Sequence, residues 1–112
     1  MNIVTNRESK PEVILIRALE PVDGIELMKQ RRKNSDIKLL CNGPGKLSQA
    51  MGITKADYGK DLCGDTLYLE GSGLLKSKEI VRTKRINIDY AEEARDYLWR
   101  FAIKNNPFVS KP

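Results

Sequence analysis

The sequence predicts an α+β fold in which a few short helices accompany a curved, mostly antiparallel sheet. Apolar stretches rich in β-branched residues, which are typical of strands, recur along the chain. Two helical segments bounded by Gly or Pro stand together in the first half. The resulting order, β-α-α-β-β-β, groups strands and helices rather than alternating them, which favours α+β. The length of 112 residues leaves room for one domain, residues 1–112.

The first predicted elements are a strand over 13–18 and a helix over 24–33. Residues 13–18 are apolar apart from Arg17, so we expect this strand to be buried. Pro21 ends the strand. Asp23 is a suitable N-cap for the helix, since its carboxylate can accept a hydrogen bond from a free N–H of the first turn.

The second helix is predicted from a proline between two glycines. Proline is favoured at the first helical position because its missing N–H needs no partner there, so Pro44 predicts a helix start. Gly52 supplies the helix stop. Gly43 and Gly45 leave the backbone bare and Lys46 adds a charge, an arrangement that suits a phosphate. A purely structural helix start fits the same residues equally well.

The second half of the chain is predicted to form mainly strands. The alternation of apolar and polar residues in 66–70 is typical of a half-buried strand. Residues 80–88 are predicted to form another strand, with a bend near Lys84. Trp99 and Phe101 of the last strand are expected to be core aromatics. The other predicted elements are a loop with a helical turn at 54–64, a turn at 71–73, an exposed connection at 74–78, a helical turn at 91–95 and a strand at 99–103.

The charge balance favours a polyanionic partner. Twenty Lys and Arg against fifteen Asp and Glu give a formal charge of +5, and such an excess favours polyanions over neutral partners. The basic cluster at 29–33 fits either a nucleic-acid contact or a solvated helix face.

Composition also limits the class of protein. No apolar run approaches the ~20 residues of a membrane span and no signal sequence precedes the first strand, so we expect a cytoplasmic (nucleoid-associated) or nuclear protein that is not secreted. Cys41 and Cys63 are too few and too far apart for a metal site, so we expect two reduced thiols.

Three sequence blocks resemble the 3-methyladenine (alkyladenine) DNA glycosylase family. The family block LIRALEP..G...M...R corresponds to residues 15–32, the block (S/N)GP.KL..A..I to 42–53, and the block RIGID.AGEARDYPWRF to 85–101. They occur in the family's order and spacing over nearly the whole chain. Residues 1–4 resemble a mid-chain strand of the family, so the resemblance covers its C-terminal portion only. It implies a compact mixed fold around a curved antiparallel sheet, and this chain is expected to be incomplete relative to that fold.

Arg17 is the strongest candidate site residue. A guanidinium within an apolar strand needs a partner, and the residues alone fit either an ion pair with a carboxylate such as Glu20 or a role in a site. The family resemblance implies that Arg17 holds the hydrolytic water and the catalytic glutamate in place. It also implies that the backbone carbonyl of Ile88 accepts a hydrogen bond from that water, and that Asn2 lines the floor of the base pocket. The family's glutamate lies upstream of the matched part, so this chain has no assigned general base.

The resemblance also assigns a set of residues to the DNA backbone, which they would position without reading base sequence. They are Gly43, Gly45, Lys46 and Lys55.

Three residues depart from the family pattern. Asn87 and Glu92 stand where the family usually has glycine, and Leu98 stands where it has proline. Because glycine permits backbone dihedrals that are closed to other residues, we expect a locally altered loop here.

The resemblance implies a monofunctional DNA glycosylase of base-excision repair, which hydrolyses the N-glycosidic bond of alkylated or deaminated purines in duplex DNA. No metal or organic cofactor is implied. Without a general base, we expect the chain to be inactive by itself. Two alternatives stay open: a non-catalytic DNA-binding remnant of the family, and a small module that binds a phosphorylated metabolite at residues 43–45. For partners we expect either a missing N-terminal half or self-association through open strand edges.

Overall fold

The computed structural model describes residues 1–7, 9–10, 12–71 and 77–110. It confirms an α+β fold with antiparallel strand pairs. The helices are α1 (Ile25–Arg32) and α2 (Pro44–Met51), and the strands are β1 (Asn2–Val4), β2 (Val13–Leu15), β3 (Ile80–Thr83) and β4 (Arg100–Ile103). Short 3-10 turns lie at η1 (Ile37–Leu39), η2 (Lys55–Asp57), η3 (Ser77–Glu79) and η4 (Asp89–Asp96). No helix in the described ranges has the length and apolar character that crossing a membrane requires.

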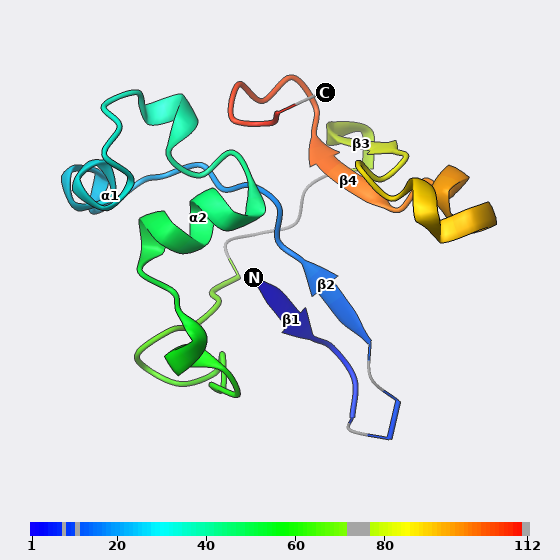
Figure 1. Ribbon diagram of the computed structural model, residues 1–112, viewed down its shortest axis with the longest axis horizontal. Coiled ribbons are helices and arrows are strands. Elements are labelled where there is room, and N and C mark those ends of the chain that lie inside the picture. Colours follow the sequence, from blue (N-terminus) through cyan, green and yellow to red (C-terminus); the bar gives the residue numbers. More distant parts are fainter. Residues whose placement is uncertain (8, 11, 72–76, 111–112) are drawn as a thin grey trace.

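The strands form two separate pairs. β1 pairs with β2, with Asn2 opposite Leu15, and β3 pairs with β4, with Ile80 opposite Ile103. Figure 1 shows α1 and α2 beside each other on one side of the molecule, the β1–β2 pair in the middle and the β3–β4 pair on the far side. Among the described residues each sheet therefore has two strands, and each pair has open edges.

A small core lies where α1 and α2 meet the chain that follows β2. Its fully or nearly fully buried members are Leu40, Cys41, Leu47 and Ala50. The partly buried Met1, Ile16, Leu19, Ile25 and Met28 pack against them. Burial raises the pKa of the Cys41 thiol, although the nearby Arg32 charge opposes this. Both cysteines are free, as predicted.

The predicted start and stop of α2 are confirmed. Pro44 occupies the first turn behind the extended N-cap Gly43. Gly52 ends the helix at φ 69°, and its N–H donates to the Gln49 carbonyl at 3.2 Å. The positive φ favours glycine here, and a Cβ at this position would lie 3.0 Å from the Arg31 guanidinium, which would have to shift slightly.

Two arginines of the basic cluster join α1 to the core segment. Arg31 Nη1 donates to the Ala50 carbonyl at 3.0 Å. Arg32 Nε donates to the Leu40 carbonyl at 3.1 Å, and its Nη2 donates to the Leu39 carbonyl at 3.2 Å. These contacts satisfy carbonyls at the ends of a helix and of a 3-10 turn. Arg31 is nevertheless exposed, as the solvated-face interpretation expects, whereas Arg32 is half-buried.

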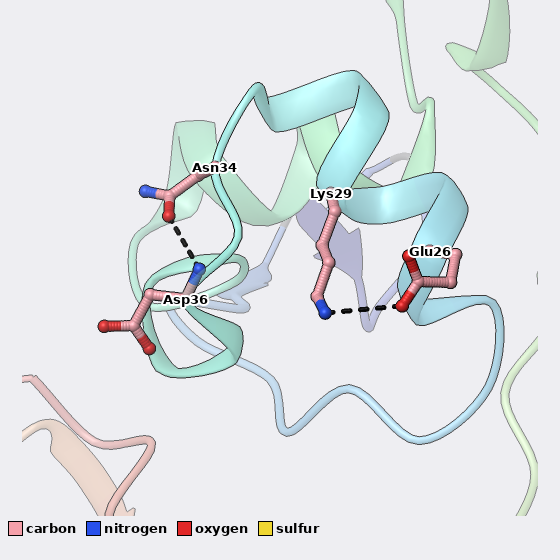
Figure 2. A network of polar contacts seen from close by, with 4 residues as sticks. All are labelled: Glu26, Lys29, Asn34 and Asp36. Carbon is pink, nitrogen blue, oxygen red and sulfur yellow. Dashed lines mark hydrogen bonds and ion pairs between the residues drawn. The ribbon is translucent and has the colours of Figure 1, made fainter.

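The other three residues of the cluster differ in exposure: Gln30 and Lys33 are exposed, whereas Lys29 is half-buried. Figure 2 shows Lys29 Nζ paired with Glu26 Oε1 at 3.3 Å on the outer side of α1. In the loop that follows, the Asp36 N–H donates to Asn34 Oδ1 at 2.9 Å. A partly solvated pair of this kind adds little stability, and the solvated-face interpretation holds for Gln30 and Lys33.

The prediction of a buried strand over 13–18 is wrong in length and in burial. β2 ends at Leu15 and its three residues are exposed. After Leu15 the chain turns toward the core, where the Leu19 N–H donates to the Cys41 carbonyl at 3.0 Å. No second layer covers β2 within the part of the chain that the structure describes. The predicted N-cap Asp23 is also wrong: Gly24 caps α1 at φ 71° without a side-chain hydrogen bond.

Predictions for the second half are partly confirmed. β3 ends before the expected bend at Lys84, β4 covers most of 99–103, and the expected helical turns appear as η2 and η4. The predicted strand at 66–70 is reduced to a single bridge between Cys63 and Tyr68, because no neighbouring strand extends the pairing within the described ranges. Most of the turn predicted at 71–73 and of the connection at 74–78 lies outside the described residues.

Trp99 and Phe101 are not core residues. Their side chains are 55% and 61% exposed. Trp99 instead packs edge-on against Tyr97, with ring centroids 4.7 Å apart, and Arg82 lies over Phe101 at 5.3 Å. The β3–β4 pair has no opposing layer among the described residues that would bury these rings.

Asn87 and Glu92, which stand where the family usually has glycine, both have the positive φ that glycine adopts easily. Asn87 lies at φ 58°, and Glu92 at φ 53° and ψ −126°. Asparagine is among the residues that tolerate the left-handed region, whereas glutamate is not. The chain therefore holds strain at Glu92 that a glycine would release.

Glu92→Gly is expected to stabilise the protein by about 1 kcal/mol, because glycine adopts this conformation without the penalty of a Cβ. Urea unfolding followed by circular dichroism measures the change. Glu93→Gly is the matched control, since Glu93 has no positive φ and glycine there only adds unfolded-chain entropy. Equal effects of the two substitutions would contradict the account of strain.

Candidate active site

A cavity of about 830 Å³ lies between the β1–β2 region and the β3–β4 region. One wall consists of Asn2 and every residue from 13 to 19. The other consists of residues 99–103, part of the loop before η4 and part of the C-terminal segment 106–110. Both walls are predominantly apolar.

The cavity brings together the three residues that the sequence assigned to the chemistry and to the base. Asn2, Arg17 and Ile88 all line it. Asn2 lies on β1 and is exposed, while Arg17 lies two residues beyond the end of β2 and is half-buried. Ile88 comes from the opposite wall, immediately before η4.

Arg17 has no ion-pair partner among the described residues. The predicted candidate Glu20 is exposed, and its Oε1 accepts a hydrogen bond from Asn106 Nδ2 at 3.3 Å instead. The structural ion pair that was the alternative for Arg17 is therefore not formed in the part of the chain described.

Two further arginines line the cavity, and the sequence reasoning missed both. Arg100 is only 8% exposed, and its guanidinium donates to Thr83 Oγ1 at 3.2 Å and to the Ser110 carbonyl. Burial lowers the pKa of Arg100, and the like charge of Arg17 lowers it further. Arg85 stacks over Trp99 at 5.2 Å, and its Nε is buried without a hydrogen-bond partner among the described residues.

The signal for Arg100 was present in the sequence. It stands between Trp99 and Phe101 in a predicted strand, which is the same pattern of a guanidinium among apolar residues that singled out Arg17. Together the three arginines make the cavity strongly cationic. No Asp or Glu is among its described lining residues, so none of these side chains offers a carboxylate to the three arginines.

The residues assigned to the DNA backbone lie elsewhere. Gly43, Gly45 and Lys46 form the start of α2, and Lys55 lies in η2. Gly43 is extended and makes no side-chain cap, so the first N–H groups of α2 receive no side-chain oxygen from it. Lys46 and Lys55 are exposed. None of the four lines the cavity. The residues assigned to the DNA backbone therefore lie apart from those assigned to the base and the water.

Within the described ranges, no three His, Cys, Asp or Glu side chains gather closely enough to bind a metal ion.

The chain's likeness to known proteins is extensive. A profile of the family described as Methylpurine-DNA glycosylase (MPG) matches residues 1–107. A relative from Alkaliphilus oremlandii, provisionally named 3-methyladenine DNA glycosylase, is 50% identical over 119 residues, covering 99% of this chain and 58% of the relative. Relatives with the same provisional name are 51% identical in Clostridium acetobutylicum (98% of this chain, 57% of the relative) and 50% identical in Bacillus mycoides (98% and 59%).

The α+β fold and the cationic cavity are thus found in a chain whose sequence matches DNA repair proteins along nearly its whole length. The chain belongs to the methylpurine-DNA glycosylase family. It spans a little under three-fifths of the length of these curated relatives.

Proposed function

We propose that this chain supplies the water-positioning and DNA-binding part of a monofunctional DNA glycosylase of base-excision repair. Its substrates would be alkylated or deaminated purines in duplex DNA, whose N-glycosidic bond is hydrolysed. The observation that carries the proposal is the shared cavity of Asn2, Arg17 and Ile88. Family membership and the names of the relatives support the substrate class.

In this proposal the damaged nucleotide leaves the base stack and enters the cavity, as any enzyme that acts on a base within a duplex requires. Asn2 lies at the floor and presents an amide to the base. Arg17 donates hydrogen bonds that orient the attacking water, and the Ile88 carbonyl accepts one from it. The water oxygen bonds to the sugar carbon as the glycosidic electron pair leaves with the base. A cationic alkylated base departs readily, whereas a neutral one needs protonation.

The proton of the water needs an acceptor, and we infer that this acceptor lies outside the described residues that line the cavity. No carboxylate is among the described lining residues, and loss of a general base typically costs about 10²–10⁴ in rate. We therefore propose that the 112-residue chain is inactive by itself. The same observation favours, as a second candidate function, a non-catalytic DNA-binding remnant of the family.

Duplex binding is expected to weaken steeply with salt. If Lys46, Lys55 and the start of α2 neutralise three phosphates, the logarithm of the binding constant should fall with a slope of about −3 against the logarithm of salt concentration. Lys46→Ala should reduce that slope by about 1. Fluorescence anisotropy with a labelled duplex at several salt concentrations measures it.

Lys10→Ala is the matched control for this titration, because Lys10 is an exposed lysine outside α2 and η2. We expect it to leave the slope unchanged. Binding that is insensitive to salt and is displaced by inorganic phosphate would instead favour the metabolite-binding module at residues 43–45.

The proposal extends to partners and location. Open edges of β1–β2 and β3–β4 support self-association of the isolated chain, since an unpaired edge invites pairing with another strand. A substrate of duplex DNA would place the protein with the nucleoid in the cytoplasm, or in a nucleus.

A further inference from the structure

Arg100 places a fixed positive charge on the wall of the cavity. It lies on β4, is 8% exposed, and lines the cavity together with Arg17 and Arg85. Its guanidinium donates to Thr83 Oγ1 at 3.2 Å and to the Ser110 carbonyl, which hold it between the end of β3 and the C-terminal segment. The guanidinium is therefore oriented before any ligand enters the cavity.

Both acceptors of Arg100 are neutral, so neither of them cancels its charge. Among the ion pairs of the described residues none involves Arg100, and no Asp or Glu is among the described lining residues. Burial lowers the pKa of Arg100, and the like charge of Arg17 lowers it further, but an arginine stays protonated at neutral pH. Because little solvent screens a buried charge, a base in the cavity experiences the positive field of Arg100.

A positive field distinguishes two chemical classes of purine. A deaminated purine such as hypoxanthine is neutral within the nucleotide, whereas a purine methylated at its N7 atom carries a full positive charge. As the glycosidic electron pair leaves with the base, the deaminated purine becomes negative and the methylated purine becomes neutral. The methylated base thus carries one more positive charge throughout the reaction, and a nearby cation raises the energy of its transition state relative to that of the neutral base.

We propose that Arg100 is a specificity-determining residue whose charge makes the cavity favour neutral deaminated purines over cationic alkylated purines. The inference rests on the proposed function, because it requires the base to enter the cavity. Coulomb's law, with an effective dielectric constant of about 20 and a separation of about 10 Å, gives a factor on the order of tenfold in kcat/KM between the two classes.

The test compares two substrates in one series of proteins. The parent is a chimera in which residues 1–112 replace the matched segment of the Alkaliphilus oremlandii relative. Two duplexes carry either inosine or N7-methylguanine at the same position. Arg100→Gln removes the charge, so we expect kcat/KM for methylguanine divided by kcat/KM for hypoxanthine to rise about tenfold. A purely structural loss slows release of both bases and leaves this ratio unchanged.

Two further variants separate the charge of Arg100 from its packing. Thr83→Asp places a carboxylate where Thr83 Oγ1 already accepts a hydrogen bond from Arg100, and Thr83 is not among the residues that line the cavity. This variant neutralises the charge while keeping the arginine, so we expect the ratio to rise as in Arg100→Gln. Arg100→Lys keeps the charge, so we expect it to retain the parent ratio.

Arg82→Gln is the matched control. Arg82 lies on β3 opposite Phe101, is exposed, and is not among the residues that line the cavity. Its substitution removes the same unit of charge from the same pair of strands. We expect the ratio to stay within twofold of the parent value.

The outcomes distinguish this inference from the proposed function. An unchanged ratio in folded Arg100→Gln and Thr83→Asp proteins that still release both bases would overturn the inference and leave the proposed function intact. An equal rise of the ratio in Arg82→Gln would also overturn it, because net charge and not the cavity would then set the preference. A folded chimera that releases neither base would count against the proposed function, and the inference would fall with it.

Discussion

Arg17→Gln is expected to lower base release about 100-fold in a glycosylase that contains this chain, because a mispositioned reacting group typically costs a factor of that order. The suitable protein is a chimera in which residues 1–112 replace the matched segment of the Alkaliphilus oremlandii relative, to which the chain is 50% identical. Arg17 lines the cavity opposite Ile88 and has no ion-pair partner among the described residues, so its donors are available to orient water. Single-turnover release of hypoxanthine from an inosine-containing duplex measures the effect.

Arg7→Gln in the same chimera is the matched control. Arg7 is exposed and lies outside the cavity, so its removal takes away one positive charge without touching the site. We expect a rate within twofold of the parent. Affinity for undamaged duplex should be similar in both variants. An Arg17→Gln chimera that is folded and reacts at the parent rate would show that Arg17 has no part in the reaction.

Leu47→Ala is expected to destabilise the protein by about 3–5 kcal/mol, the range for a buried leucine whose cavity cannot collapse. Leu47 is fully buried in a core with only three other buried members among the described residues. A total stability of about 5–15 kcal/mol is usual for a domain, and small cores fall at the low end. The substitution should therefore lower the urea midpoint sharply or abolish cooperative unfolding, as followed by circular dichroism.

The control for Leu47→Ala is Leu27→Ala. Leu27 lies in α1 and is 48% exposed, and alanine is at least as good a helix former as leucine. We expect a loss below about 1 kcal/mol for such a surface position. If both variants lost the same stability, the core would not lie where α1 and α2 meet.

Local chemistry explains the elements that the sequence predicts well. Pro44 and Gly52 define α2 through their own backbones: the proline ring fixes φ in the helical range, and the lack of a Cβ lets glycine adopt the left-handed conformation that ends the helix. The alternation at 66–70 has no such local origin. A strand needs a neighbour from elsewhere in the chain, and the structure gives that segment only one bridge.

The site was predictable where an unusual residue stood in an unusual context. Arg17 within an apolar stretch marked one wall of the cavity, and Arg100 between two aromatics marks the other by the same rule. Arg31 and Arg32 show the limit of this reasoning. Their charge suggested a partner or solvent, but Arg31 donates to a carbonyl of α2 and Arg32 to the carbonyl at the end of η1, which the packing around α1 brings near. Tertiary contacts of this kind cannot be predicted from the local sequence.

Asn2, Arg17 and Ile88 line one cavity, and we propose that the base that activates water there comes from outside the part of this chain that the structure describes. The most direct test compares single-turnover hypoxanthine release by the purified 112-residue chain and by the chimera on the same inosine-containing duplex. We predict release by the chimera and none by the chain alone. Release by the highly purified chain at the chimera's rate, abolished by Arg17→Gln, would contradict the claim.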